Sequence, residues 1–144
     1  MKKIFLKILK LLTILQLRSE YLRQGINLPK LSYSLGLDAK LSLDLGSGPK
    51  PKNPFNAIEV FGVDIRSYDV NEKVKKCTIG SQELPFEDNY FDFITAFDVL
   101  EHIPRASMSG NKTIFPFVET MNEIWRVPQS GGLFYSQTPC YSIK

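Results

Sequence analysis

Short apolar runs separated by polar segments dominate the chain from residue 40 onward. These runs lack clean alternation of apolar and polar residues, which is typical of strands covered on both faces. Between the fourth and fifth runs, apolar residues recur at helical spacing. This order predicts an α/β fold, a Rossmann-like, mostly parallel sheet with flanking helices. The five predicted strands are Leu41–Leu45, Ile58–Ile65, Val74–Ile79, Phe91–Phe97 and Gly132–Thr138.

The predicted helix before the last strand has an apolar stripe, which we expect to pack in the core. Arg126 follows near its end, where a cation is expected to serve the last helical carbonyl groups. The apolar side chains expected in the core here are Phe115, Phe117, Met121, Ile124 and Trp125.

The N-terminal segment, residues 1–24, has apolar residues at helical spacing and lysines on another face, which predicts an amphipathic helix. Three interpretations remain open: a helix packed on its own domain, an interfacial membrane helix (residues 1–20), or a cleaved signal peptide. Lysines interrupt its apolar region, and no A-x-A cleavage site follows. Residues 25–39 contain glycine, proline and polar residues and are interpreted as a connector. Residues 40–144 then form the main domain.

Charge is unevenly distributed along the 144 residues. Residues 1–23 hold six basic residues and one acidic residue, whereas the remainder holds 12 basic and 14 acidic residues. The main domain is therefore mildly acidic, which argues against a nucleic-acid partner. The two cysteines, Cys77 and Cys140, form no CxxC pair. We expect free thiols in a reducing, cytoplasmic compartment, with membrane association left open by the N-terminal segment.

The candidate chemistry follows the first two strands. Gly46 and Gly48 come directly after the first strand, where glycines let backbone N–H groups approach a ligand. Asp64 ends the second strand, 18 positions after Gly46, where a carboxylate can accept hydrogen bonds from both ribose hydroxyls. Singly, the glycines also fit an ordinary strand-to-helix turn, and Asp64 a helix N-cap. Together they favour a ligand that contains a nucleoside.

Five motifs in this order resemble the class I S-adenosylmethionine-dependent methyltransferases, in particular the small-molecule subgroup similar to ubiquinone-biosynthesis enzymes. The resemblance covers about residues 40–139. Proline at position 51 departs from the third glycine of hydride-transfer dehydrogenases. The motifs are Leu43–Gly48, Phe61–Ile65, Leu84–Asp92, Asp98–His102 and Glu123–Leu133.

The resemblance implies S-adenosyl-L-methionine as the cofactor and assigns roles to the residues after the first two strands. Asp44 would stand near the ammonium group of the methionine part, directly or through water. Gly46 and Gly48 would let the backbone pass close to the same part. Asp64 would hold the ribose hydroxyls, and Ile65 would pack on the adenine face.

Later positions complete the implied site. Ser81 and Gln82 would border the adenine, and Phe97 and Asp98 would line the methionine and substrate side. His102, the one histidine in the chain, is a candidate general base, because imidazole titrates near neutral pH. The alternative to a general base is that His102 has only a structural role, as a packed histidine in the helix after the fourth strand.

The sequence departs from the family pattern in two places. Three prolines between positions 49 and 54 predict a stiff, extended segment where the family usually starts a helix. Neither Gly80 nor Ser81 is the aspartate that often accepts from the adenine amino group, so Gln82 or a backbone carbonyl would substitute.

A metal site is the weaker alternative for the fourth motif. On a helix, Asp98, Glu101 and His102 would share a face, as in related enzymes that use E-x-x-E-H to hold a divalent cation. Aspartate replaces the first glutamate here, and we assign no metal ligands.

We therefore expect methyl transfer to a small-molecule acceptor. Two alternatives stay open: a cofactor-binding remnant without catalysis, and a membrane-surface accessory protein that uses residues 1–20. The family has seven strands, and the last two form an antiparallel hairpin. Because this chain accounts for five, we expect a truncated domain with an exposed edge strand and a tendency to self-associate.

Overall fold

The computed structural model describes residues 40–68 and 71–139. The predicted N-terminal helix, residues 1–24, and the connector, residues 25–39, lie outside the described residues, as does Cys140. Within the described part, no helix is long and apolar enough to cross a membrane.

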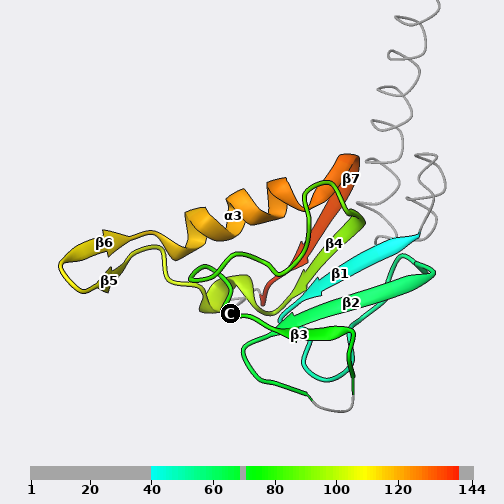
Figure 1. The fold of residues 1–144 in the computed structure, drawn as a ribbon, viewed down its shortest axis with the longest axis horizontal. Coiled ribbons are helices and arrows are strands. Elements are labelled where there is room, and N and C mark those ends of the chain that lie inside the picture. The colour runs from blue at the N-terminus through cyan, green and yellow to red at the C-terminus, as the bar shows by residue number, and fades with distance from the viewer. Residues whose placement is uncertain (1–39, 69–70, 140–144) are drawn as a thin grey trace, which may run out of the picture. The chain divides into compact units, whose positions relative to one another are not determined.

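A five-stranded parallel sheet forms the centre of the described domain (Figure 1). Its strand order is β3-β2-β1-β4-β7, and each neighbouring pair is parallel. Every predicted strand is present, with ends shifted by up to four residues, so the predicted α/β fold with a parallel sheet is confirmed. The strands are β1 (Leu41–Leu45), β2 (Glu59–Asp64), β3 (Val74–Lys76), β4 (Phe91–Phe97) and β7 (Pro128–Gln137).

The connection from β4 to β7 contains more structure than the sequence predicts. A 3₁₀ helix, Leu100–His102, follows β4, and an antiparallel hairpin of β5 (Ser107–Ser109) and β6 (Lys112–Ile114) comes next. The hairpin projects away from the sheet, and the chain returns through α3 (Pro116–Arg126) (Figure 1). Its strands have three residues each, too short for a recognisable period-2 pattern.

Helix α3 packs on one face of the sheet and closes the main core. Ile124 and Val127 join Leu43, Val63 and Ile94 in one buried cluster. Proline at the first helical position suits the helix start, because its missing N–H has no intrahelical partner there.

The apolar stripe of α3 is narrower than expected. Trp125 is 87% exposed and Phe115 is 52% exposed, so their predicted place in the core is wrong. Consecutive residues on an α-helix point about 100° apart, so Trp125 turns away when Ile124 faces the sheet. Phe115 precedes the helix and is not held by its packing.

The long segment between β1 and β2 covers part of the opposite face. It contains no helix, as its prolines predict. Its anchor is Phe55, which is 2% exposed and stacks on Phe93 of β4 with ring centroids 4.2 Å apart. Stacked aromatic pairs of this kind stabilise beyond their buried area.

Replacing Phe55 with alanine should therefore destabilise the domain. We expect Phe55→Ala to lower the free energy of unfolding by about 3–5 kcal/mol, because it leaves a cavity against Phe93. Ile58→Ala, in the same segment but 80% exposed, should change it by less than about 0.5 kcal/mol. Urea unfolding measures both variants, and equal losses would contradict the assigned anchor.

Candidate functional site

The carboxyl ends of β1, β2 and β4 meet at one edge of the sheet. Leu45 pairs with Val63 of β2 and with Ala96 of β4, so the residues that follow these three positions are neighbours. The structure thus brings together Gly46, Asp64 and Phe97, as the parallel arrangement predicts. Ligands of open α/β sheets bind at such an edge.

A tight turn built on two glycines follows β1. Gly46 and Gly48 have φ of 65° and 60°, a left-handed conformation that glycine adopts without strain. The intervening Ser47 donates its N–H to the carbonyl of Val63 at 3.1 Å, which fixes the turn on β2. A Cβ atom at Gly46 would lie 2.6 Å from Cγ2 of Val99, whereas one at Gly48 would meet nothing within 4 Å. Gly48 therefore leaves room for a ligand.

Asp64 ties the end of β2 to this glycine turn. Its Oδ2 accepts the N–H of Gly48 at 3.0 Å. Its Oδ1 accepts the N–H of Arg66 at 2.9 Å and the hydroxyl of Tyr68 at 3.3 Å. Burial raises the pKa of this carboxyl, but the hydrogen bonds from Arg66, Gly48 and Tyr68 outweigh burial and leave its pKa below the ordinary value. Asp64 is therefore held as a carboxylate beside the turn.

Asp44 lies deeper, inside β1, and is 2% exposed. Its Oδ1 accepts the hydroxyl of Thr95 at 2.7 Å, and its Oδ2 accepts the N–H of Lys52 at 2.8 Å. Burial raises the pKa of Asp44, and the hydrogen bonds and the charge of Lys52 only partly oppose this effect. The Nζ of Lys52 lies 4.4 Å from the ring centroid of Phe97, so a cation already rests on the predicted methionine side.

Sequence reasoning missed four of these partners: Thr95, Lys52, Arg66 and Tyr68. A threonine inside a run of buried apolar residues was a usable signal, because a buried hydroxyl must find a hydrogen-bond partner. Lys52 and Tyr68 reach the site from irregular segments, for which the sequence offers no spacing rule.

Ser81 and Gln82 lie in a turn that starts just after β3. The N–H of Cys77 donates to the carbonyl of Asp64 at 2.8 Å, which brings the start of this turn beside the acid. Both Ser81 and Gln82 are exposed. They line a cavity of about 460 Å³ whose other wall comes from Thr113–Phe115, Glu119 and Glu123. Ile65, the predicted adenine contact, is 62% exposed beside Asp64.

The helical interpretation of Asp98, Glu101 and His102 is wrong. Asp98 has φ of 54° and stands outside the 3₁₀ helix, and its N–H donates to the carbonyl of Gln137 at 2.8 Å. A left-handed residue breaks the helical spacing that would align the three side chains. Across residues 40–68 and 71–139, no three His, Cys, Asp or Glu side chains gather to hold a metal ion. His102 is exposed, so the packed interpretation is also wrong.

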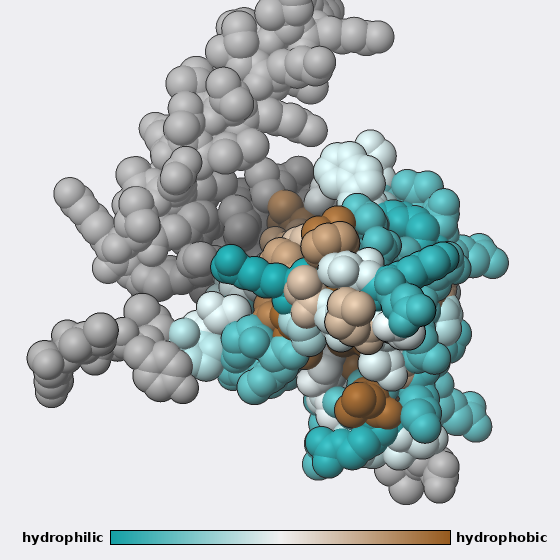
Figure 2. All heavy atoms as spheres, turned by 90° about the vertical axis from the view of Figure 1, so that its left-hand side faces the viewer, coloured by the Kyte–Doolittle hydropathy of each residue, from teal (hydrophilic) through white to brown (hydrophobic). Residues whose placement is uncertain are grey.

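A wide groove follows the ends of β4 and β7. Its volume is about 830 Å³, its wall is mainly apolar, and Glu101 and Arg105 contribute charge. Seen from the hairpin side of the molecule, apolar residues gather in the middle of the surface and hydrophilic residues surround them (Figure 2). The remaining lining residues are Leu100, Ile103, Pro104, Phe117, Val118, Thr138 and Pro139.

The two glycines of the turn should respond differently to the same substitution. We expect Gly48→Ala to cost about 1–2 kcal/mol of unfolding free energy, the strain of a left-handed alanine. Gly46→Ala should cost about 1–3 kcal/mol more, because its Cβ would also overlap Val99. Urea unfolding separates the two variants. Equal losses of unfolding free energy would show that the Val99 side chain can move aside without destabilising the fold.

The lowered pKa of Asp64 predicts an acid-dependent stability. Its ionised form stabilises the fold fully above the unfolded pKa of about 3.8, and this contribution is lost as pH falls through the lower folded pKa. Asp64→Asn should therefore cost about 1–3 kcal/mol at pH 7 and progressively less toward pH 2. Urea unfolding at several pH values measures this difference, with Glu72→Gln as an exposed control. A pH-independent difference would contradict it.

Comparison with known proteins identifies a family for this chain. Residues 43–136 match the family described as "Methyltransferase domain". No curated protein matches. Among solved structures, the chain is similar to a putative S-adenosyl-L-methionine-dependent methyltransferase from Methanococcus maripaludis, with 18% identity and a TM-score of 0.48. That match covers 77% of this chain and 55% of the other, so this chain spans about half of the solved relative. Because the family match extends over most of the chain, the protein belongs to the class I methyltransferase domain family, whose cofactor is S-adenosylmethionine.

Proposed function

We propose that this chain binds S-adenosylmethionine at the carboxyl ends of β1, β2 and β4 and transfers its methyl group to a small-molecule acceptor. The carboxylate of Asp64 beside the glycine turn is the observation that carries the proposal. A carboxylate offers about four acceptor positions, and the structure fills three of them. One position on Oδ2 remains, and the 3.3 Å bond from Tyr68 is the weakest of the three. Asp64 thus has capacity for both ribose hydroxyls if Tyr68 moves aside.

The rest of the edge also fits this cofactor. Gly48 has open space where a side chain would block a ligand. The carboxyl group of Asp44 and the ring of Phe97 together suit a cationic group. In this structure the N–H of Lys52 bonds Asp44, and its Nζ lies over the ring of Phe97. A bound ligand ammonium would take over part of the role that Lys52 plays.

The acceptor is proposed to enter the groove of about 830 Å³ after β4 and β7. Its mainly apolar wall suits an apolar molecule, and Glu101 and Arg105 suit polar substituents on it. The cofactor supplies a methyl group on an already activated sulfonium. The protein therefore mainly orients the acceptor and excludes water. His102, exposed beside Glu101, remains our candidate for taking a proton from the acceptor.

Asp64→Ala should weaken cofactor binding. We expect the Kd for S-adenosylhomocysteine, measured by calorimetry on the full chain, to rise about 10- to 100-fold, because charge-assisted hydrogen bonds to the ribose are lost. Glu72→Ala, an exposed carboxylate on the segment before β3, is the matched control and should leave the Kd unchanged. Full affinity in Asp64→Ala would refute the ribose assignment.

A second measurement distinguishes an active methyltransferase from a cofactor-binding remnant without catalysis. The wild-type chain is incubated with methyl-labelled cofactor and pools of small aromatic and aliphatic hydroxy, amino and thiol acceptors. Label in an extracted product supports methyl transfer, whereas tight binding without transfer to any pool supports a cofactor-binding remnant.

A further inference from the structure

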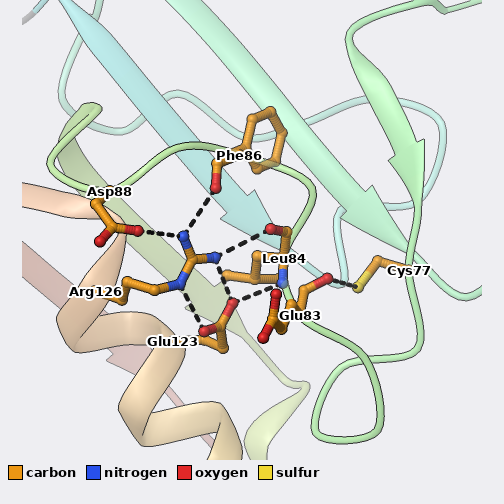
Figure 3. A network of polar contacts seen from close by, with 7 residues as sticks. All are labelled: Cys77, Glu83, Leu84, Phe86, Asp88, Glu123 and Arg126. Carbon is orange, nitrogen blue, oxygen red and sulfur yellow. Dashed lines mark hydrogen bonds and ion pairs between the residues drawn. The ribbon is translucent and has the colours of Figure 1, made fainter.

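The segment after β3 is fastened to α3 by one ion pair, Glu123 and Arg126 (Figure 3). Oε2 of Glu123 accepts the N–H of Leu84 at 2.6 Å, and Nη2 of Arg126 donates to the carbonyl of Leu84 at 3.1 Å. The pair thus satisfies both backbone groups of one residue, as a neighbouring strand would. These bonds hold the backbone of the segment, in addition to the packing of the buried Leu84 side chain in the core.

Arg126 uses its whole guanidinium group in this cluster. Nε and Nη2 donate to Glu123 at 2.7 and 2.6 Å. Nη1 donates to the carbonyl of Phe86 at 3.0 Å and to Asp88 at 2.7 Å. With the bond to Leu84, these contacts use all five N–H donors of an arginine side chain, which lysine cannot reproduce. The predicted role of Arg126, at the last carbonyls of its own helix, is therefore wrong.

The electrostatics keep the pair ionised. Hydrogen bonds from Arg126 lower the pKa of Glu123, and this effect outweighs the opposing effect of burial. The same bonds raise the pKa of Arg126. Both groups carry their charges throughout the physiological range, so the fastening does not loosen with modest changes in pH.

Helix α3 also contacts this segment at a second point. Gly80 has φ of 82°, and a Cβ there would lie 2.7 Å from the carbonyl oxygen of Pro116. The turn that carries Ser81 and Gln82 therefore lies between two contacts with the same helix, at Pro116 and at Glu123. Helix α3 has 11 residues and is rigid over this length, so it fixes where the turn stands.

The turn offers a hydrogen-bonding pattern to a ligand. Oε1 of Gln82 accepts the N–H of Thr78 at 2.8 Å, and because a backbone N–H only donates, this contact fixes the orientation of the amide. The NH₂ group of Gln82 then remains as a donor, and its Oε1 keeps a second lone pair that can accept a hydrogen bond. Adenine, with an accepting N1 and a donating 6-amino group, complements this pattern, and hypoxanthine reverses it.

We propose that Glu123 and Arg126 are positioning residues that hold the Ser81–Gln82 turn as the surface that recognises the adenine edge of the cofactor. This inference rests on the proposed cofactor site. Glu123 borders the same cavity as Ser81 and Gln82, but both of its carboxylate oxygens are already bonded to Arg126 and to the N–H of Leu84. The pair is therefore proposed to act through the backbone of Leu84. Its loss should therefore reduce selectivity for the base more than it reduces binding in general.

The test compares S-adenosylhomocysteine with S-inosylhomocysteine, which differ at the base edge. Calorimetry on the full wild-type chain should show a preference for adenine of at least 10-fold. Arg126→Met and Glu123→Gln should reduce that preference below about 3-fold, while the Kd for S-inosylhomocysteine stays within about 2-fold of wild type. Arg126→Lys keeps the positive charge but loses the planar guanidinium group, so it should give an intermediate preference for adenine. It also replaces Arg126→Met in the comparison if that variant does not fold.

The matched control is another ion pair of the domain. Nζ of Lys73 and Oε2 of Glu59 are 3.2 Å apart on exposed side chains. Glu59→Gln removes this pair away from the turn and should leave the preference unchanged. Thermal melting of each variant confirms that the titrated protein is folded.

Several results would overturn the inference. Equal weakening of both ligands would assign the pair a general structural role, and an unchanged preference would assign it none. A wild-type chain that binds both ligands equally would show that the turn does not recognise adenine, while the cofactor site would stand. A wild-type chain that binds neither ligand would refute the cofactor proposal itself, before any variant is compared.

Discussion

Carboxylates that accept backbone N–H groups hold the loops of this domain in place. Asp44 accepts from Lys52, Asp64 from Gly48 and Arg66, and Asp92 from Lys40 and Leu41. The partly buried Glu123 does the same for Leu84. A carboxylate with little access to water must be hydrogen-bonded, and a loop N–H without a strand partner has the same need. Each such contact satisfies both requirements; those of Asp44, Asp64 and Glu123 fix a loop, and that of Asp92 fixes the start of β1.

This constraint also shapes the candidate site. In the proposed site, the oxygens of Asp44 and Asp64 that order the loops are the same atoms that would bind the cofactor. The two acids differ because burial raises the pKa of Asp44, whereas several donors leave the pKa of Asp64 lowered. Asp64 is therefore the stronger anchor for neutral hydroxyls. Asp44 gains more from a nearby cation, a need that Lys52 now partly meets.

The sequence predicts those parts of the fold that depend on local pattern. Phe91–Phe97 is a mainly apolar run that contains Asp92 and Thr95, and it forms a central strand with its first six residues buried. The neighbouring strand ends follow from parallel pairing, so the meeting of Gly46 and Asp64 was predictable as well. The hairpin at β5 and β6 was not, because its short strands carry no clear period. The exposure of Trp125 was not predictable either, because apolar character alone does not show which helix residues face the sheet.

Helix α3 links these findings. Its E-x-x-R spacing, Glu123 to Arg126, was visible in the sequence as a motif and as an i,i+3 ion pair. What spacing cannot reveal is the third partner, because Leu84 is 39 positions away from Glu123. A charged pair on a helix is usually worth little at the surface. Here it replaces a missing strand neighbour for a backbone segment, so its contribution lies in where it places that segment rather than in its own Coulomb energy.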